Sequence, residues 1–121
     1  MEQTNNHIAI CVATYKRPDL LKECLTKIYL LELPKKNKIF LIVVDNDVNE
    51  TAKPTVDLFN KNYNFPIHYF VEPERGISST RNRLIDESLK LKSSIICFID
   101  DDESPKKNWL TSHLNALIKY N

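Results

Sequence analysis

Short apolar runs alternate along the chain with segments in which apolar residues recur at helical spacing. The runs of strand length are His7–Ala13, Ile39–Val44, Ile67–Val71 and Ser94–Ile99. Helical spacing predicts helices over Pro18–Tyr29, residues 51–62, Ser78–Leu91 and Lys106–Tyr120. The pattern therefore predicts four strands and four helices in strict alternation.

This alternation is typical of an α/β fold whose mostly parallel sheet is covered by helices on both faces. The strands are apolar throughout, which agrees with burial on both sides. We therefore expect one three-layer, Rossmann-like domain over residues 1–121. Right-handed crossovers would bring the carboxyl ends of the strands to one edge, where open α/β sheets bind ligands.

Composition narrows the classes of function. With 17 basic and 16 acidic residues in 121, the chain shows no sign of binding nucleic acid or an anionic membrane. No apolar run approaches the roughly 18 residues of a membrane span, and the N-terminus lacks a signal-peptide pattern. Cys11, Cys24 and Cys97 lie in apolar segments, so we expect buried, reduced thiols in a cytoplasmic protein.

The chain has a single glycine, Gly76, which excludes the glycine-rich phosphate loops. Gly76 precedes the third helix, where a left-handed or closely approached backbone would be useful. The amino end of that helix favours a phosphate. Arg81 interrupts the apolar stripe of the helix there, which is unfavourable unless it meets an anion, either a ligand or a nearby acid. Arg83 is expected to face solvent.

Four consecutive acids, Asp100 to Glu103, follow the fourth strand. Two such charges 4 Å apart repel by about 4 kcal/mol at an effective dielectric of about 20. A hard dication such as Mg²⁺ or Mn²⁺ would relieve this repulsion. Asp100 and Asp102 can face one way and hold a metal that also binds a diphosphate, while Asp101 faces the other. The alternative is a solvated acidic turn before a helix.

Polar residues also follow the first two strands, and their roles stay open. Tyr15 could contact a base or pack at the strand end, and Arg17 could reach a phosphate or pair with Asp19. Asp45 and Asp47 could bond a nucleoside or serve as turn and cap residues. His7, His68 and His113 have no nucleophile beside them and are expected to be structural or exposed.

Four segments together resemble the nucleotide-sugar-binding half of family 2 glycosyltransferases, which have the GT-A fold. These segments are VATYKRPDLL, VVDNDVN, PERGISSTRNRLI and FIDDDE, and SPKKNWL follows them. They occur in the family's order and spacing over almost the whole chain. The resemblance implies a UDP-, dTDP- or GDP-linked sugar donor, Mg²⁺ or Mn²⁺ as cofactor, and inverting transfer to a glycan or lipid-linked acceptor in bacterial polysaccharide synthesis.

The resemblance also implies roles for particular residues. Tyr15 would lie near the base with Asp45 or Asn46 beside it, Arg81 near the diphosphate or sugar, and Asp101 near the sugar or ribose. Asp100 and Asp102 would form the metal pair. The full donor-binding set is Thr14, Tyr15, Arg17, Asp45, Asn46, Asp47, Gly76, Arg81, Asp100 and Asp101. The chain departs from the family's pattern at Val48, in place of the usual serine, and at Leu84, in place of a glycine.

Family members generally continue well beyond this length, into a part with the acceptor contacts and the general base. We therefore expect a donor-binding domain without the acceptor half, and we assign no catalytic base. Peripheral association with the inner membrane face is compatible with this expectation. The alternative is a non-catalytic nucleotide-sugar-binding or truncated scaffold module. A phosphoacceptor receiver domain is not favoured, because it needs paired acids after the first strand, where Thr14 and Tyr15 stand.

Overall fold

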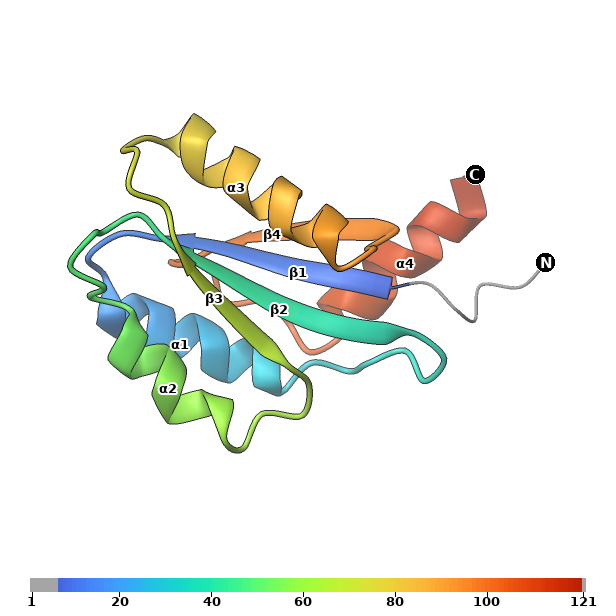
Figure 1. Ribbon diagram of the computed structural model, residues 1–121. Helices are drawn as coiled ribbons and strands as arrows, with labels where there is room; N and C mark the ends of the chain where they lie inside the picture. The colour runs from blue at the N-terminus through green and yellow to red at the C-terminus, as the bar shows by residue number, and fades with distance from the viewer. Residues whose placement is uncertain (1–6, 121) are drawn as a thin grey trace.

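The computed structural model describes residues 7–120, with the side chains of residues 7–116, and shows a parallel sheet between two layers of helices (Figure 1). Its four strands lie in the order β3-β2-β1-β4. The strands are β1 (His7–Thr14), β2 (Lys38–Asp45), β3 (Ile67–Val71) and β4 (Ile95–Asp100). The helices are α1 (Pro18–Tyr29), α2 (Lys53–Asn60), α3 (Ile77–Lys90) and α4 (Trp109–Tyr120).

All eight elements predicted from the sequence occur, in the predicted order. The bounds of most differ by one or two residues. The largest difference is at α4, which begins at Trp109 rather than Lys106 because residues 107–108 form a turn. The backbone N–H of Trp109 closes that turn by donating to the carbonyl of Lys106.

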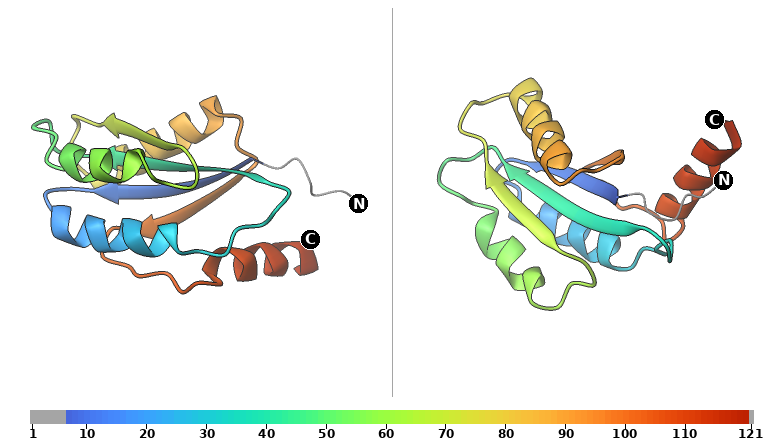
Figure 2. Two further views of the ribbon diagram at one scale, coloured as in Figure 1. Left: turned by 90° about the horizontal axis from the view of Figure 1, so that it is seen from below. Right: turned by 45° about the vertical axis from the view of Figure 1, so that its right-hand side comes forward.

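Helices cover both faces of the sheet, as the apolar strands predicted. Figures 1 and 2 show α3 on one side of the sheet and α1 and α2 on the other. Alternate residues of β1 point to opposite faces. Ile8, Ile10 and Val12 join a core with residues of α1, α2 and α4, whereas Ala9 and Cys11 join a smaller core with Leu84 of α3.

The strands end together at one edge of the sheet. Thr14 of β1 pairs with Asp45 of β2, Asp45 with Val71 of β3, and Ala13 with Asp100 of β4. The first residues after all four strands are therefore close in space. This is the edge at which open α/β sheets bind their ligands.

Within the described residues, no helix combines the length and the apolar character that crossing a bilayer requires.

Candidate functional site

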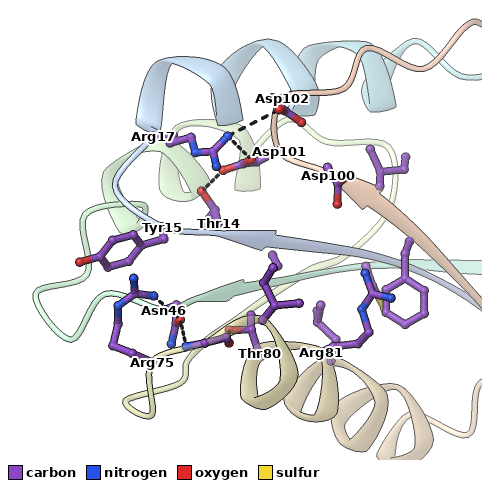
Figure 3. Close-up of a pocket in the computed structure, with 17 residues that line it drawn as sticks. Thr14, Tyr15, Arg17, Asn46, Arg75, Thr80, Arg81, Asp100, Asp101 and Asp102 are labelled. Carbon is purple, nitrogen blue, oxygen red and sulfur yellow. Dashed lines mark hydrogen bonds and ion pairs between the residues drawn. The ribbon is translucent and has the colours of Figure 1, made fainter.

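A cavity of about 460 Å³ lies at this edge, between the strand ends and the first turns of α3 (Figure 3). Residues following all four strands contribute to its wall. Arg17 and Asn46 follow β1 and β2, Arg75 and Gly76 follow β3, and Asp101 and Asp102 follow β4. The wall is completed by Cys11, Ala13, Thr14, Tyr15, Ile77, Thr80, Arg81, Leu84, Phe98, Ile99 and Asp100.

Asp101 turns inward and ties β4 to the end of β1. Its side chain accepts a hydrogen bond of 2.9 Å from the Thr14 hydroxyl, and Arg17 Nη1 lies 3.5 Å from its other oxygen. Burial raises the pKa of this carboxyl, and the Thr14 bond and the Arg17 charge oppose that rise. Asp101 therefore bonds the end of β1 and Arg17 while it still lies on the wall of the cavity.

Asp100 and Asp102 are both exposed and lie on the wall of the cavity. In Figure 3 the Asp100 side chain points into the cavity and Asp102 lies beside Arg17, whose Nη1 is 3.6 Å from it. Glu103 folds back on Asp100, accepting its backbone N–H at 2.7 Å. The acids do not begin a helix, because α4 starts at Trp109. Over the described part of the chain, no three His, Cys, Asp or Glu side chains converge as a ready-made metal site.

The other end of the cavity is built around the Tyr15 ring. The guanidinium carbon of Arg75 lies 3.5 Å from the centroid of that ring, and Arg75 Nη1 donates to Asn46 Oδ1 at 2.7 Å. Tyr15 is half-buried and Arg75 is exposed. This end thus presents a flat aromatic group with a cation stacked on it.

Asn46 is buried, and both the nitrogen and the oxygen of its side-chain amide form hydrogen bonds with the loop of residues 72–76. Its Nδ2 donates to the carbonyls of Glu72 and Glu74, at 2.7 and 2.8 Å, and its Oδ1 also accepts the backbone N–H of Gly76 at 3.0 Å. The family resemblance implied that Asp45 or Asn46 lies beside the base, and that role stays a prediction. In the structure, the hydrogen bonds of Asn46 hold the loop that carries Arg75.

Gly76 has φ +133°, a conformation that side chains with a Cβ rarely adopt. A Cβ there would meet only Ser79 Oγ, at 3.8 Å, so the requirement is conformational and does not come from a close approach. The carbonyl of Gly76 accepts both the hydroxyl and the backbone N–H of Thr80, in the first turn of α3.

Arg81 lies on the cavity wall and is exposed, with its guanidinium carbon 5.0 Å from the centroid of the Phe98 ring. Among the described residues it forms no ion pair. Its charge is therefore available to an anion inside the cavity.

Asp45, the last residue of β2, and Asp47, in the segment between β2 and α2, are not among the residues that line the cavity. Asp45 accepts hydrogen bonds from the backbone of Asp47 and Ala52 and from the Tyr69 hydroxyl, at 3.0, 2.9 and 2.7 Å. Asp47 accepts from the backbone of Asn49 and from the Thr51 hydroxyl. These contacts are those of turn and cap residues, the alternative that the sequence left open.

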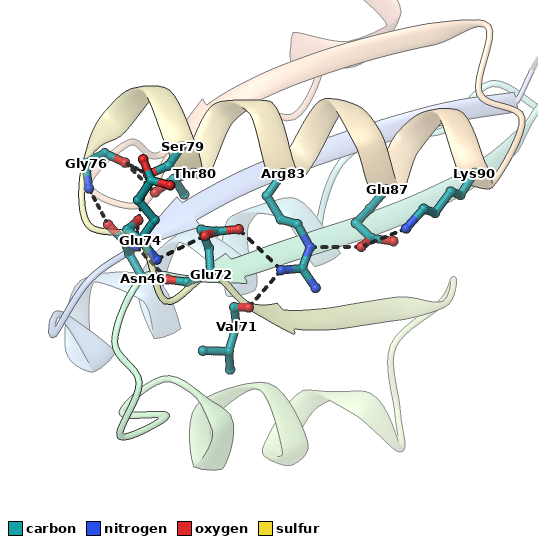
Figure 4. Close-up of polar contacts among 10 residues, drawn as sticks. All are labelled: Asn46, Val71, Glu72, Glu74, Gly76, Ser79, Thr80, Arg83, Glu87 and Lys90. Atoms are coloured by element: carbon teal, nitrogen blue, oxygen red, sulfur yellow. Dashed lines mark hydrogen bonds and ion pairs between the residues drawn. The ribbon is translucent and has the colours of Figure 1, made fainter.

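The prediction that Arg83 faces solvent is wrong. Arg83 Nε donates to Glu87 at 2.9 Å, and its Nη1 donates to the Val71 carbonyl at 2.9 Å and to Glu72 at 3.3 Å (Figure 4). The hydrogen bond to Glu87 is the main reason that its pKa is raised. Helical spacing puts Arg83 on a different side of the helix from the apolar stripe that includes Arg81, which is why solvent exposure was predicted. Spacing within one helix could not show that the end of β3 lies beside Arg83.

Sequence reasoning did not single out Arg75, Thr80 or Phe98 as site residues. For Arg75 a signal existed, because it directly precedes the one glycine, at a strand end on the ligand-binding edge. Phe98 and Thr80 gave no such signal, since each sits within a regular element.

Residues 9–121 match the family model described as glycosyl transferase family 2, and the chain belongs to that family. Among curated proteins, it is similar to the succinoglycan biosynthesis protein ExoM of Rhizobium meliloti (strain 1021). The two are 35% identical over 110 residues, which are 91% of this chain and 34% of ExoM. The chain thus spans about a third of the length of the curated relative it matches.

Solved structures confirm the fold. The crystal structure of S. aureus TarS 1-349 in complex with UDP aligns with a TM-score of 0.77 at 18% identity, over 93% of this chain and 32% of that one. The mannosyltransferase PcManGT from Pyrobaculum calidifontis, in complex with GDP-Man and Mn²⁺, aligns with a TM-score of 0.61 at 22% identity, over 78% of this chain and 27% of that one. The α/β, GT-A-type fold expected from the sequence is therefore confirmed.

Proposed function

We propose that the cavity binds a nucleotide-sugar donor and that the chain supplies the donor-binding part of a glycosyltransferase in polysaccharide synthesis. Family membership supports glycosyl transfer, and ExoM is named for succinoglycan biosynthesis. The TarS structures hold UDP or UDP-GlcNAc, and that of PcManGT holds GDP-Man and Mn²⁺. Inverting transfer to a glycan or lipid-linked acceptor is part of this proposal. The acceptor contacts would lie outside residues 1–121, and the free cysteines suit a cytoplasmic protein.

The single observation that carries the proposal is the polarity of the cavity from end to end. One end presents the Tyr15 ring, on which a base can stack. The other presents Arg81 and the carboxylates of Asp100 and Asp102. A nucleoside diphosphate has the same polarity, with a planar base at one end and an anionic diphosphate at the other.

Asp100 and Asp102 suit a hard dication, because carboxylate oxygens are the ligands that Mg²⁺ and Mn²⁺ prefer. Mg²⁺ is commonly held by one or two carboxylates together with substrate phosphates. The lack of a third protein ligand among the described residues agrees with that mode. When bound, the dication would stabilise negative charge on the departing nucleoside diphosphate.

Arg17 forms ion pairs with two of the consecutive acids at this end. It lies 3.5 Å from Asp101 and 3.6 Å from Asp102, and its side chain is half exposed. Its pair with Asp102 is exposed and contributes about 0–1 kcal/mol, so that pair would give way readily to a more strongly bound dication, whereas Asp101 is buried.

Isothermal titration calorimetry with UDP and GDP tests the proposal. In Mn²⁺ we expect saturable binding of at least one of the two, and we expect EDTA to abolish it. Heat that is absent with both nucleotides, with or without Mn²⁺, would contradict the proposal and favour the scaffold alternative.

A further inference from the structure

We propose that the edge of the sheet opposite the cavity binds an anionic phospholipid surface. The residues that carry this inference do not line the cavity. The inference therefore does not rest on the binding of a nucleotide.

This edge is where the strands begin and where α1 and α3 end. In Figure 1 the strands begin on the right and end on the left, so this edge and the cavity lie at opposite ends of the sheet. Lys38 begins β2 and pairs with His7 of β1, whose carbonyl accepts the backbone N–H of Ser94. Residues 35–38 and 91–94 therefore flank the start of β1. We call this surface the amino edge and define it by Lys27, Leu30, Lys35, Lys36, Lys38, Leu89 and Lys92.

The lysines of the amino edge have no acidic partners. All five are exposed, and among the described residues none of them forms an ion pair. Over residues 26–39, 60–67 and 88–95, which contain the helix ends and strand starts, Glu32 is the sole acid. Lys27 also complements the carboxyl end of α1, but Lys35, Lys36 and Lys38 lie outside the helices, so no helix dipole accounts for them.

Many of the acids lie at the opposite edge of the sheet. Asp45, Asp47, Glu72, Glu74 and residues 100–103 lie at or just after the ends of β2, β3 and β4. The net charge of +1 gave no sign of binding to an anionic membrane, because a sum does not record where the charges lie. An anionic surface would attract a molecule with this separation of charge and would turn the amino edge toward itself.

Two leucines favour a lipid surface over a soluble polyanion as the partner. Leu30 directly follows α1 and is 54% exposed, and Leu89 near the end of α3 is 58% exposed. Lys27 lies three residues before Leu30, and Lys92 three residues after Leu89. At a bilayer surface, apolar side chains enter the boundary below the headgroups while lysines contact the anionic headgroups. A nucleic acid or an acidic glycan offers no such apolar layer.

Co-sedimentation with lipid vesicles tests this inference. The chain should bind vesicles of phosphatidylcholine and phosphatidylglycerol at least about tenfold more tightly than vesicles of phosphatidylcholine alone, since each lysine near an anionic surface adds about fivefold. Raising the ionic strength from about 0.1 M to about 1 M shortens the Debye length from about 10 Å to about 3 Å and should weaken this binding.

A charge-matched pair of triple variants locates the binding surface. Lys35→Gln, Lys36→Gln and Lys38→Gln, combined in one chain, should weaken binding to the anionic vesicles by at least about tenfold. The control loses the same charge at exposed lysines away from the amino edge, through Lys16→Gln, Lys22→Gln and Lys53→Gln. It should bind within about twofold of the wild type, because these lysines would lie farther from the lipid than a Debye length.

A double variant, Leu30→Ser with Leu89→Ser, tests the apolar part. It should weaken vesicle binding by about fivefold or more, because burial of the leucines in lipid is lost. Its binding to heparin, a soluble polyanion, should match that of the wild type. The melting temperature of each variant confirms that it is folded.

Three results would overturn the inference. Equal binding to the two kinds of vesicle would show that anionic lipid is not recognised. Equal losses in the two triple variants would show that total charge, and not the amino edge, governs binding. Vesicle binding that does not respond to the leucine substitutions would assign the edge to a soluble polyanion. Nucleotide and Mn²⁺ enter none of these measurements, so each of these results leaves the proposed function standing.

Discussion

Asp100, Asp101 and Asp102 are adjacent in sequence, yet the structure gives their carboxylates different surroundings. Asp101 is buried on Thr14, while Asp100 and Asp102 are exposed on the cavity wall. Only their exposure alternates, because Asp101 and Asp102 share Arg17 and Figure 3 draws the side chains of Asp100 and Asp102 pointing in different directions. Their use as metal ligands stays a prediction.

Replacing Asp102 by alanine should abolish the effect of Mn²⁺ on nucleotide binding and leave stability near or above that of the wild type. The ion pair that is lost, with Arg17 at 3.6 Å, is exposed and contributes about 0–1 kcal/mol, and repulsion from Asp101 is relieved. Calorimetry with and without Mn²⁺, together with thermal melting, measures both effects. Asp86→Ala, on the exposed face of α3, is the matched control. Unchanged Mn²⁺-dependent affinity in Asp102→Ala would refute the assignment.

Arg81 permits a similar test at the level of one residue. Arg81→Ala should weaken nucleoside diphosphate binding by about 1.5–3 kcal/mol, the range for hydrogen bonds to charged groups. The loss should be smaller for the monophosphate, since Arg81 is placed at the diphosphate end. Calorimetry with UDP and UMP compares the two, and equal losses would show that Arg81 does not contact the second phosphate.

The three cysteines should be nearly inert in the folded protein. Burial raises the pKa of Cys11 and of Cys97 to about 11, and that of Cys24 to about 12. The thiolate is the reactive form, so at pH 7.5 little of it exists until unfolding returns the pKa to about 8.5. Because the folded state holds these protons longer, stability should fall as pH rises from about 8.5 toward 11.

Reaction with a disulfide reagent at pH 7.5, with and without urea, measures this protection. Three thiols should react rapidly in urea and slowly in buffer. Cys97 is the most sensitive test, because it is the one of the three that is not fully buried. Rapid reaction of Cys97 in buffer would contradict the expected protection.

At the scale of elements, the side of α3 opposite the cavity fastens the end of β3. Arg83 Nη1 donates to the Val71 carbonyl and to Glu72. Its Nε donates to Glu87, which is only 7% exposed. The same Glu87 lies 3.7 Å from the exposed Lys90. One buried acid thus has a half-buried partner and an exposed one, which makes a matched comparison possible.

Arg83→Met should lower the free energy of unfolding by about 2 kcal/mol, because it leaves buried Glu87 poorly paired and removes two bonds to the end of β3. Lys90→Met should change it by less than about 0.5 kcal/mol, as is usual for an exposed ion pair. Urea denaturation followed by circular dichroism measures both. Equal losses in the two variants would show that the contacts of Arg83 with β3 do not contribute.

The elements themselves could be predicted because strands that are buried on both faces of a sheet consist of continuous apolar runs. The run IAICV of β1 is fully buried in both cores, and Pro18 begins α1 as expected. The start of α4 could not be predicted as well, because Lys106 fits a helix or a turn equally. Its turn is fixed by tertiary contact, since the carbonyl of Lys107 accepts the N–H of Glu32.

The whole molecule places one cavity where four strand ends meet. Most of the polar residues that the sequence analysis named lie on its wall. Asp45, at the end of β2, and Asp47, just after it, do not, and both bond the segment that leads into α2. Topology alone could predict the edge. It could not predict which side chains bond the backbone of a neighbouring loop, as the buried amide of Asn46 does.

The central claim is that this cavity holds a nucleoside diphosphate with a dication at its acidic end. Amide NMR of the labelled chain during titration with UDP or GDP, first with Mg²⁺ and then with Mn²⁺, tests it most directly. We expect Mg²⁺ and nucleotide to shift the amides of residues 14–17, 75–81 and 100–102, and Mn²⁺ to broaden most strongly those around Asp100 and Asp102. Shifts confined to other parts of the chain, or Mn²⁺ broadening centred away from those two aspartates, would contradict the account.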